Sequence, residues 1–131
     1  DYLDQSRKFP IEKSFVVNNS DEAWNAIGQL NVIGHGSMYG YNVIDTADDG
    51  IAIGRRGPQW SHKETILGRR LINGKRYFLN VNQWFYQGAK LVWIPAEDVD
   101  WIARDEMFAY SGLVGIPEDR LRWVDWTRLP V

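Results

Sequence analysis

The dipeptide Asn73-Gly74 constrains the fold of this chain more than any other short stretch of its sequence. It separates two partly apolar segments, 69–72 and 76–81. Asn-Gly readily places two successive residues at positive φ, which is what a tight hairpin turn requires. We therefore predict paired antiparallel strands over 69–72 and 76–81. A third strand is predicted over 89–94, and Pro95 is expected to end it.

Length and charge exclude several classes of protein. The chain has 131 residues, no cysteine and a formal net charge of −2. It fits one domain, or a small domain with extensions, and thiol chemistry and disulfides are excluded. The acidic balance argues against nucleic acid as a partner, although a basic patch on one face stays open as a third possibility. No segment has the length of apolar sequence that a membrane span needs, and a chain that begins with Asp1 is expected to be a piece of a longer protein.

The segments before the hairpin predict a strand, a helix and a glycine-rich stretch. A strand is predicted over 11–17, and a short helix over about 20–30 with Ser20 as its N-cap. Three glycines then surround His35, which favours a softened strand and turn. A less favoured alternative is that His35, Tyr39 and Tyr41 line a groove. Asp45–Gly50 predicts a turn, and its partial match to a calcium loop fails at Ala47 and Arg56, so no metal site is expected.

The segments after the hairpin predict less regular structure. Glu97-Asp98 is expected to be a solvated turn, and Trp101-Ile102 could complete a last strand. The segment 104–110 is expected to be a short helix or turn. Another short helix should begin near Pro117, and its apolar residues would be exposed in a free tail. We therefore expect 103–131 to fold back onto the rest of the domain.

Aromatic residues are unusually frequent, with seven Trp, six Tyr and five Phe. Such rings fill cores, but each indole also carries an N–H group that needs a partner, so some should face outward. Tyr77 and Trp93 lie in apolar strands and are expected in the core. Trp84 and Tyr86 lie in a predicted turn region, where side chains are better placed for contact. The candidate ligand-binding residues are Trp84, Tyr86, Trp60, Phe85, Arg56, Asn82 and Tyr41.

Three sets of residues resemble bacterial SH3-type modules. They are Gly68, the hairpin at 72–77, and the ending Val92-Trp93-Ile94-Pro95 with Val99. The segment 53–58, with the sequence IGRRGP, is also similar to a strand and loop that often occur in such modules. The families are the SH3b, GW and S-layer-associated wall-binding modules, and the resemblance spans roughly 43–99. It implies a mainly β fold, an SH3-like half-open β-barrel over 43–102, with short helices in extensions over 1–42 and 103–131.

The resemblance also implies a function. Similar modules are non-catalytic and anchor a secreted hydrolase or surface protein to a bacterial envelope polymer, either peptidoglycan or teichoic acid. An extracellular or cell-wall-associated location and an aromatic groove as the binding site follow from it. The alternative is an SH3-like protein-interaction or structural module of a surface, phage or secretion assembly, which would bind an extended peptide.

Catalytic motifs are not evident in the sequence. His35 and His62 have no metal-ligand spacing, and there is no GxSxG nucleophile elbow. Carboxylate pairs exist by count alone, and nothing in the sequence marks one of them as desolvated. We therefore expect no catalytic residues, no metal and no cofactor in this chain, whose parent protein could still be a cell-wall hydrolase.

Overall fold

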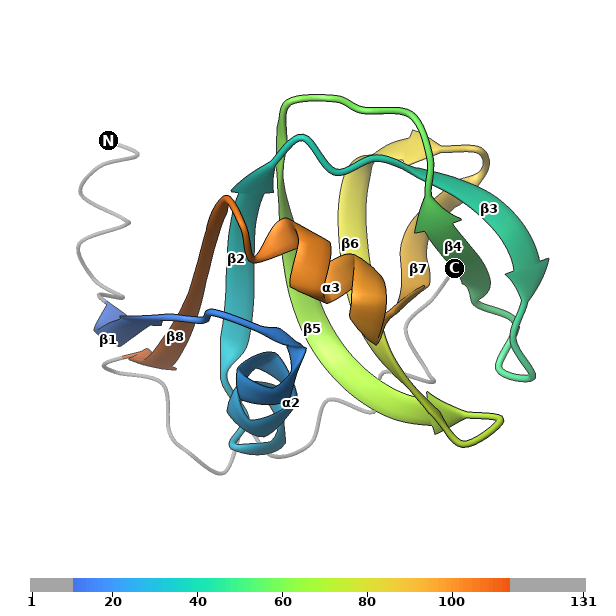
Figure 1. The fold of residues 1–131 in the computed structure, drawn as a ribbon. Coiled ribbons are helices and arrows are strands. Elements are labelled where there is room, and N and C mark those ends of the chain that lie inside the picture. Colours follow the sequence, from blue (N-terminus) through green and yellow to red (C-terminus); the bar gives the residue numbers. More distant parts are fainter. Residues whose placement is uncertain (1–10, 114–131) are drawn as a thin grey trace.

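A computed structural model describes residues 11–113 of the chain. In this range the fold is mainly β, as predicted, with two short helices (Figure 1). The helices are α2 (Ser20–Gly28) and α3 (Ala96–Ile102). The expected helix near Pro117, and most of the extension 103–131, lie outside the described residues. The described strands are β1 (Ile11–Val16), β2 (Val32–Ser37), β3 (Tyr41–Thr46), β4 (Ala52–Arg56), β5 (His62–Ile72), β6 (Lys75–Tyr86), β7 (Ala89–Pro95) and β8 (Glu106–Leu113).

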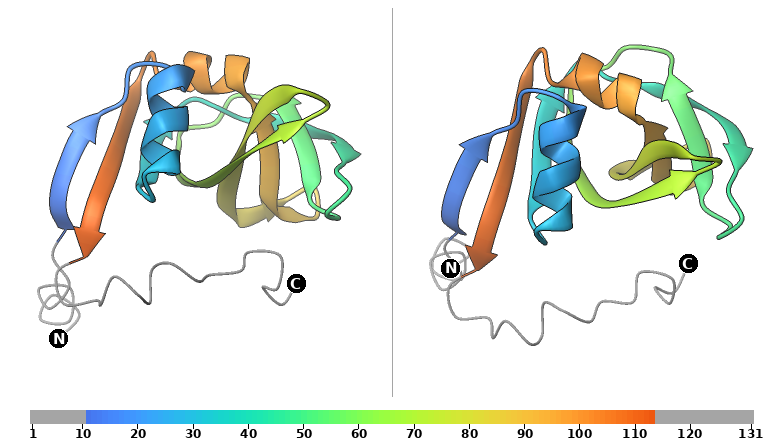
Figure 2. Two further views of the ribbon diagram at one scale, coloured as in Figure 1. Left: turned by 90° about the horizontal axis from the view of Figure 1, so that it is seen from below. Right: turned by 60° about the horizontal axis from the view of Figure 1, so that its bottom comes forward.

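The described strands form one open, mixed sheet with the order β1-β8-β2-β5-β6-β7-β4-β3. Neighbouring strands are antiparallel except β4 and β7, which form a parallel seam at Ala52↔Val92 and Ile53↔Trp93. The sheet is strongly bent, and both helices lie inside the bend (Figure 2). Strands β2 and β8, from outside the segment 43–102, belong to this same sheet, in which β2 pairs with β5 on one side and with β8 on the other.

The central hairpin forms as predicted. Asn73 and Gly74 have φ values of 50° and 74°, and Ile72 pairs with Lys75 across the turn. A second turn of the same kind joins β6 to β7, with φ values of 51° at Gln87 and 77° at Gly88. Positive φ at two successive residues matches the right-handed twist of the flanking strands. These two turns set the register of β5, β6 and β7.

Strand β6 buries side chains on both of its faces. Tyr77 and Leu79 are buried with Ile53 and Trp93 in a small apolar cluster, as predicted for Tyr77 and Trp93. The opposite face carries Phe78, Asn80 and Asn82, which are fully buried, and Phe78 belongs to the main core. Burial of two amides on this face was not evident from the sequence, because apolar residues dominate the other face.

Four predictions about local structure were wrong. Trp101-Ile102 belongs to α3 rather than to a strand, since Val99 and Ile102 are buried one helical turn apart. The Glu97-Asp98 turn is the first turn of this helix, and Asp98 is buried. Segment 104–110 is mostly strand β8, whose inward residues alternate with Phe108 and Tyr110 on the other face. Those two rings hid the period of two.

The fourth error concerns the helix start. Asn19, and not Ser20, is the N-cap of α2, and its side-chain oxygen accepts a hydrogen bond of 2.9 Å from the Glu22 N–H. The helix ends at Gly28, two residues before the predicted end at Leu30. Leu30 itself has a φ of 63°, which a helix does not allow.

Gly40 provides a test of the fold near the candidate site. A Cβ atom there would lie 1.9 Å from the Pro58 carbonyl oxygen and 2.9 Å from Trp60 Cε3. We expect Gly40→Ala to lower the free energy of unfolding by about 3 kcal/mol, since backbone must move to relieve the clash. Urea denaturation measures it. Gly68→Ala is the matched control, because its Cβ would meet only Leu79 side-chain atoms at 3.4 Å or more. Equal effects of the two substitutions would contradict the prediction.

Candidate binding site

Five rings from three parts of the chain meet at one end of the sheet. We call them the aromatic platform: Tyr41, Trp60, His62, Trp84 and Tyr86. Trp60 lies edge-on to Tyr86 with ring centroids 4.6 Å apart, and Tyr41 contacts both rings at 5.6 Å and 5.8 Å. Trp84 stacks on His62 at 3.6 Å with an interplanar angle of 21°. Trp60 and Trp84, 6.2 Å apart, join the two groups.

The platform runs from a buried base to an exposed top. Tyr41 is fully buried, Trp60 and Tyr86 are half-buried, and Trp84 is 55% exposed. Each exposed ring is therefore held by a ring beneath or beside it. Contacts of this kind fix the rings before any ligand arrives, which lowers the entropic cost of binding.

Asn82 holds the platform together from below. Its side-chain oxygen accepts a hydrogen bond of 2.9 Å from the backbone N–H of Trp84, and its Nδ2 donates to the Tyr41 hydroxyl at 3.2 Å. The side chains of Asn82 and Tyr41 are both fully buried. Both residues were predicted to contact a ligand, but the structure buries them, with Asn82 beneath the rings and Tyr41 as the base ring of the platform.

The other predicted site residues are divided. Trp60, Trp84 and Tyr86 come together as described. Arg56 is exposed on β4, but its guanidinium lies 4.9 Å over the Trp101 ring and not over a platform ring. The side chain of Phe85 lies outside the described residues. His62 was not among the predicted site residues, and its stacking on Trp84 is evident only from the structure.

A buried polar network, also missed in the sequence, lies behind the platform. His35 Nε2 is 2.9 Å from Asn80 Oδ1. The Asn80 amide in turn donates to Glu64, which also accepts from the Trp60 indole N–H at 3.5 Å. On the far side of the imidazole, the Ser37 hydroxyl lies 3.4 Å from His35 Nδ1. The network therefore connects the core of the sheet to a platform ring.

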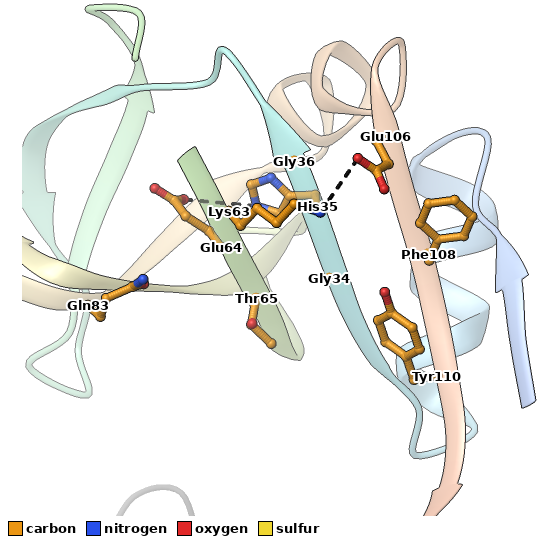
Figure 3. A pocket seen from close by; sticks show the side chains of 10 residues that line it. All are labelled: Gly34, His35, Gly36, Lys63, Glu64, Thr65, Gln83, Glu106, Phe108 and Tyr110. Carbon is orange, nitrogen blue, oxygen red and sulfur yellow. Dashed lines mark ion pairs between the residues drawn. The ribbon is translucent and has the colours of Figure 1, made fainter. Parts of the chain in front are cut away.

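The hydrogen-bond donors and acceptors of this network determine the state of His35. Asn80 uses its NH₂ group toward Glu64, so its oxygen must accept from His35 Nε2–H. His35 Nδ1 is then free to accept from Ser37, and the ring is satisfied as a neutral imidazole. Burial lowers the pKa of His35 from 6.5 to about 4. The 3.9 Å contact between His35 and Glu64, drawn in Figure 3, is thus not an ion pair at neutral pH.

Burial shifts the pKa values of two carboxyl groups in the opposite direction. It raises the pKa of Glu64 and of Asp98. Asp98 accepts hydrogen bonds from the Tyr39 hydroxyl at 2.9 Å and from the Arg56 N–H at 2.7 Å. Perturbed groups can mark active sites, but His35 and Glu64 are only 3% and 4% exposed. With both ring nitrogens of His35 already bonded, this geometry suits support of the platform.

Comparison with known proteins identifies no relative of this chain. No protein-family model matches the sequence, and the search of curated proteins found no match. The site must therefore be interpreted from its own geometry.

Two surveys of the described residues bear on ligands and membranes. Between residues 11 and 113, no three or more His, Asp or Glu side chains are grouped so as to hold a metal ion. Neither α2 nor α3, the helices of that range, has the length and apolar character needed to cross a bilayer. Asp49, from the failed calcium pattern, instead accepts hydrogen bonds from Arg70 and from the Trp93 indole.

The state of His35 predicts a pH dependence of stability. The unfolded chain takes up a proton near pH 6.5, whereas the folded imidazole stays neutral until about pH 4. Stability should therefore fall as the pH falls across this window, by roughly 3 kcal/mol from this group. The raised pKa values of Glu64 and Asp98 act in the opposite direction. Urea denaturation of the wild type and His35→Gln from pH 7 to 4 isolates the histidine contribution.

His35→Gln is a suitable comparison because its side-chain NH₂ can still donate to Asn80. We expect the variant to be less stable at pH 7 but to lose less stability than the wild type on acidification. Parallel stability curves for the two proteins would contradict the assignment of a neutral, buried His35.

Proposed function

We propose that this protein is a non-catalytic, SH3-like module that binds a bacterial cell-wall polymer through the aromatic platform, as the sequence resemblance implies. The observation that carries the proposal is the exposed indole of Trp84 on a prearranged stack of rings. The bent, open sheet is compatible with the half-open barrel expected from the resemblance.

The chemistry of wall polymers fits such a surface. Sugars and muropeptides present apolar faces together with many hydroxyl and amide groups. Aromatic rings supply area for the apolar faces, and a few polar side chains fix the orientation of the ligand. Exposed Ser61, Lys63 and Gln83 lie next to the platform residues in sequence and supply such polar groups.

The distribution of basic side chains supports a wall polymer over nucleic acid. Arg70 is paired with Asp48 and Asp49, and Arg76 with Asp21. Arg69 and Arg76 lie over the Trp24 ring. Much of the positive charge is thus balanced or stacked away from the platform, which leaves little for contacts with a phosphate backbone. By the same proposal the module acts outside the cell, on the bacterial envelope.

The proposal predicts retention on purified bacterial cell walls. Trp84→Ala should reduce binding roughly tenfold or more, because truncation of a central aromatic contact commonly costs over 1 kcal/mol. A sedimentation assay with walls, read as the bound fraction against protein concentration, measures the change. The fold should survive because the indole is mostly exposed, and circular dichroism checks this.

Leu71→Ala is the matched control, since Leu71 is 58% exposed on β5 far from the platform in the strand register. It should bind walls like the wild type. The proposal fails if the wild type is not retained, or if both variants bind equally well. Retention on an extended peptide in place of walls would favour the interaction-module alternative.

A further inference from the structure

A groove crosses the outer face of the sheet beside the platform. The register places Gly34 opposite Thr65 of β5 and Phe108 of β8. Residues paired across neighbouring strands share a face of the sheet. Strand β2 therefore has no side chain at this point, whereas both neighbouring strands do. Figure 3 shows Thr65 on one side of Gly34, with Phe108 and Tyr110 on the other.

Gly36, two residues further along β2, also leaves the groove without a side chain. It lies opposite Lys63 of β5 and Glu106 of β8. The two glycines and their neighbours enclose a cavity of about 260 Å³, which Gln83 and Tyr110 also line. The glycines thus serve as the floor, and β5 and β8 supply the walls.

A second, larger hollow continues the groove toward the platform. Its volume is about 580 Å³, and it shares Gly36, Lys63 and Glu106 with the first cavity. At its other end it is lined by Ser37, Ser61 and His62. Trp84 stacks on this same His62, so His62 joins the platform to the larger hollow, and Gly36, Lys63 and Glu106 join that hollow to the glycine-floored groove.

The groove lining suits an uncharged chain better than a polyanion. Its charged side chains are Lys63 against Glu64, Asp105 and Glu106, and Lys63 lies 3.7 Å from the Glu106 carboxylate. This one cation is therefore already balanced, and a phosphate polymer would meet a surplus of negative charge. The remaining polar groups are hydroxyls and an amide, and the rings of Phe108 and Tyr110 are partly exposed.

We propose that the platform and the groove form one extended site for a linear, uncharged glycan of N-acetylated sugars. One sugar stacks on Trp84, and the following sugars cross His62 into the groove toward Tyr110. Hydroxyl and amide groups of Ser61, Thr65 and Gln83 bind the sugar hydroxyls and acetamido groups. This inference rests on the proposed function and narrows its ligand from wall polymers in general to the glycan strand, excluding phosphate-rich teichoic acid.

Gly36 allows the groove to be blocked with little strain elsewhere. A Cβ atom at Gly36 would meet Glu106 Oε2 at 3.2 Å and Lys63 Cε at 3.4 Å. Both contacts are with the flexible ends of partly exposed side chains. Gly36→Val should therefore fill the floor, and valine is well suited to a strand. Gly34 is a poorer choice, because its Cβ would lie 3.0 Å from the Tyr110 ring.

The test uses soluble β-1,4-linked oligomers of N-acetylglucosamine, the dimer and the hexamer, titrated into the full chain by calorimetry. The hexamer should bind more tightly than the dimer. Gly36→Val should weaken hexamer binding about tenfold and leave the dimer unchanged, whereas Trp84→Ala should weaken both. Thr46→Leu, which enlarges an exposed side chain on the far edge strand β3, is the control and should change neither.

A second measurement is independent of any variant's folding. In the unmodified protein, the hexamer should shift the NMR signals of the Gly34 and Gly36 amides as well as the Trp84 indole, and the dimer only the indole. An indole shift without glycine shifts, or full hexamer binding by folded Gly36→Val, overturns the groove but leaves the platform. Tighter binding of poly(glycerol phosphate) than of the hexamer overturns the ligand class. Wall binding that is insensitive to Trp84→Ala overturns the proposed function itself.

Discussion

The structure depends on the burial of one amide, that of Asn80. In the sheet, Asn80 occupies a row of inward residues that is otherwise apolar, with Ile66 and Ile33 on one side and Val92 on the other. A buried amide without partners costs several kcal/mol. Here the next inward row supplies them, because His35 and Glu64 are paired neighbours there. The bonds formed by Asn80 thus tie β2, β5 and β6 together in one register.

Strand β6 also connects this buried amide to the exposed aromatic platform. Two residues beyond Asn80, on the same face, the Asn82 side chain forms hydrogen bonds with the Tyr41 hydroxyl and with the backbone N–H of Trp84. The alternation of β6 therefore leads from a core amide, through a second amide, to the exposed indole. A ring positioned in this way is held by the interior of the sheet rather than by a loop of its own, and such support is what a preorganised binding surface needs.

Local turn chemistry was readable in the sequence, and long-range pairing was not. The Asn73-Gly74 hairpin and the strand before Pro95 follow from a few adjacent residues, and so does helix α2 apart from its ends. Strand β8 was mistaken for a short helix or turn because Phe108 and Tyr110 are apolar residues on its outer face. The partners of His35 and Glu64, and the place of His62 under Trp84, depend on which strands are neighbours. That register is set by contacts between residues far apart in the chain.

The parallel pairing between β4 and β7 determines which strands would separate first if the domain were pulled. Only two residue pairs form it, parallel pairing is slightly weaker per residue than antiparallel pairing, and β3 lies beyond it at the edge. Tension applied across this seam would detach β3 and β4 together. The longer β5–β6 and β6–β7 pairings would separate later. Tyr41 lies on β3 and would move away with these two strands. A module under tension would therefore lose the base of its aromatic platform first.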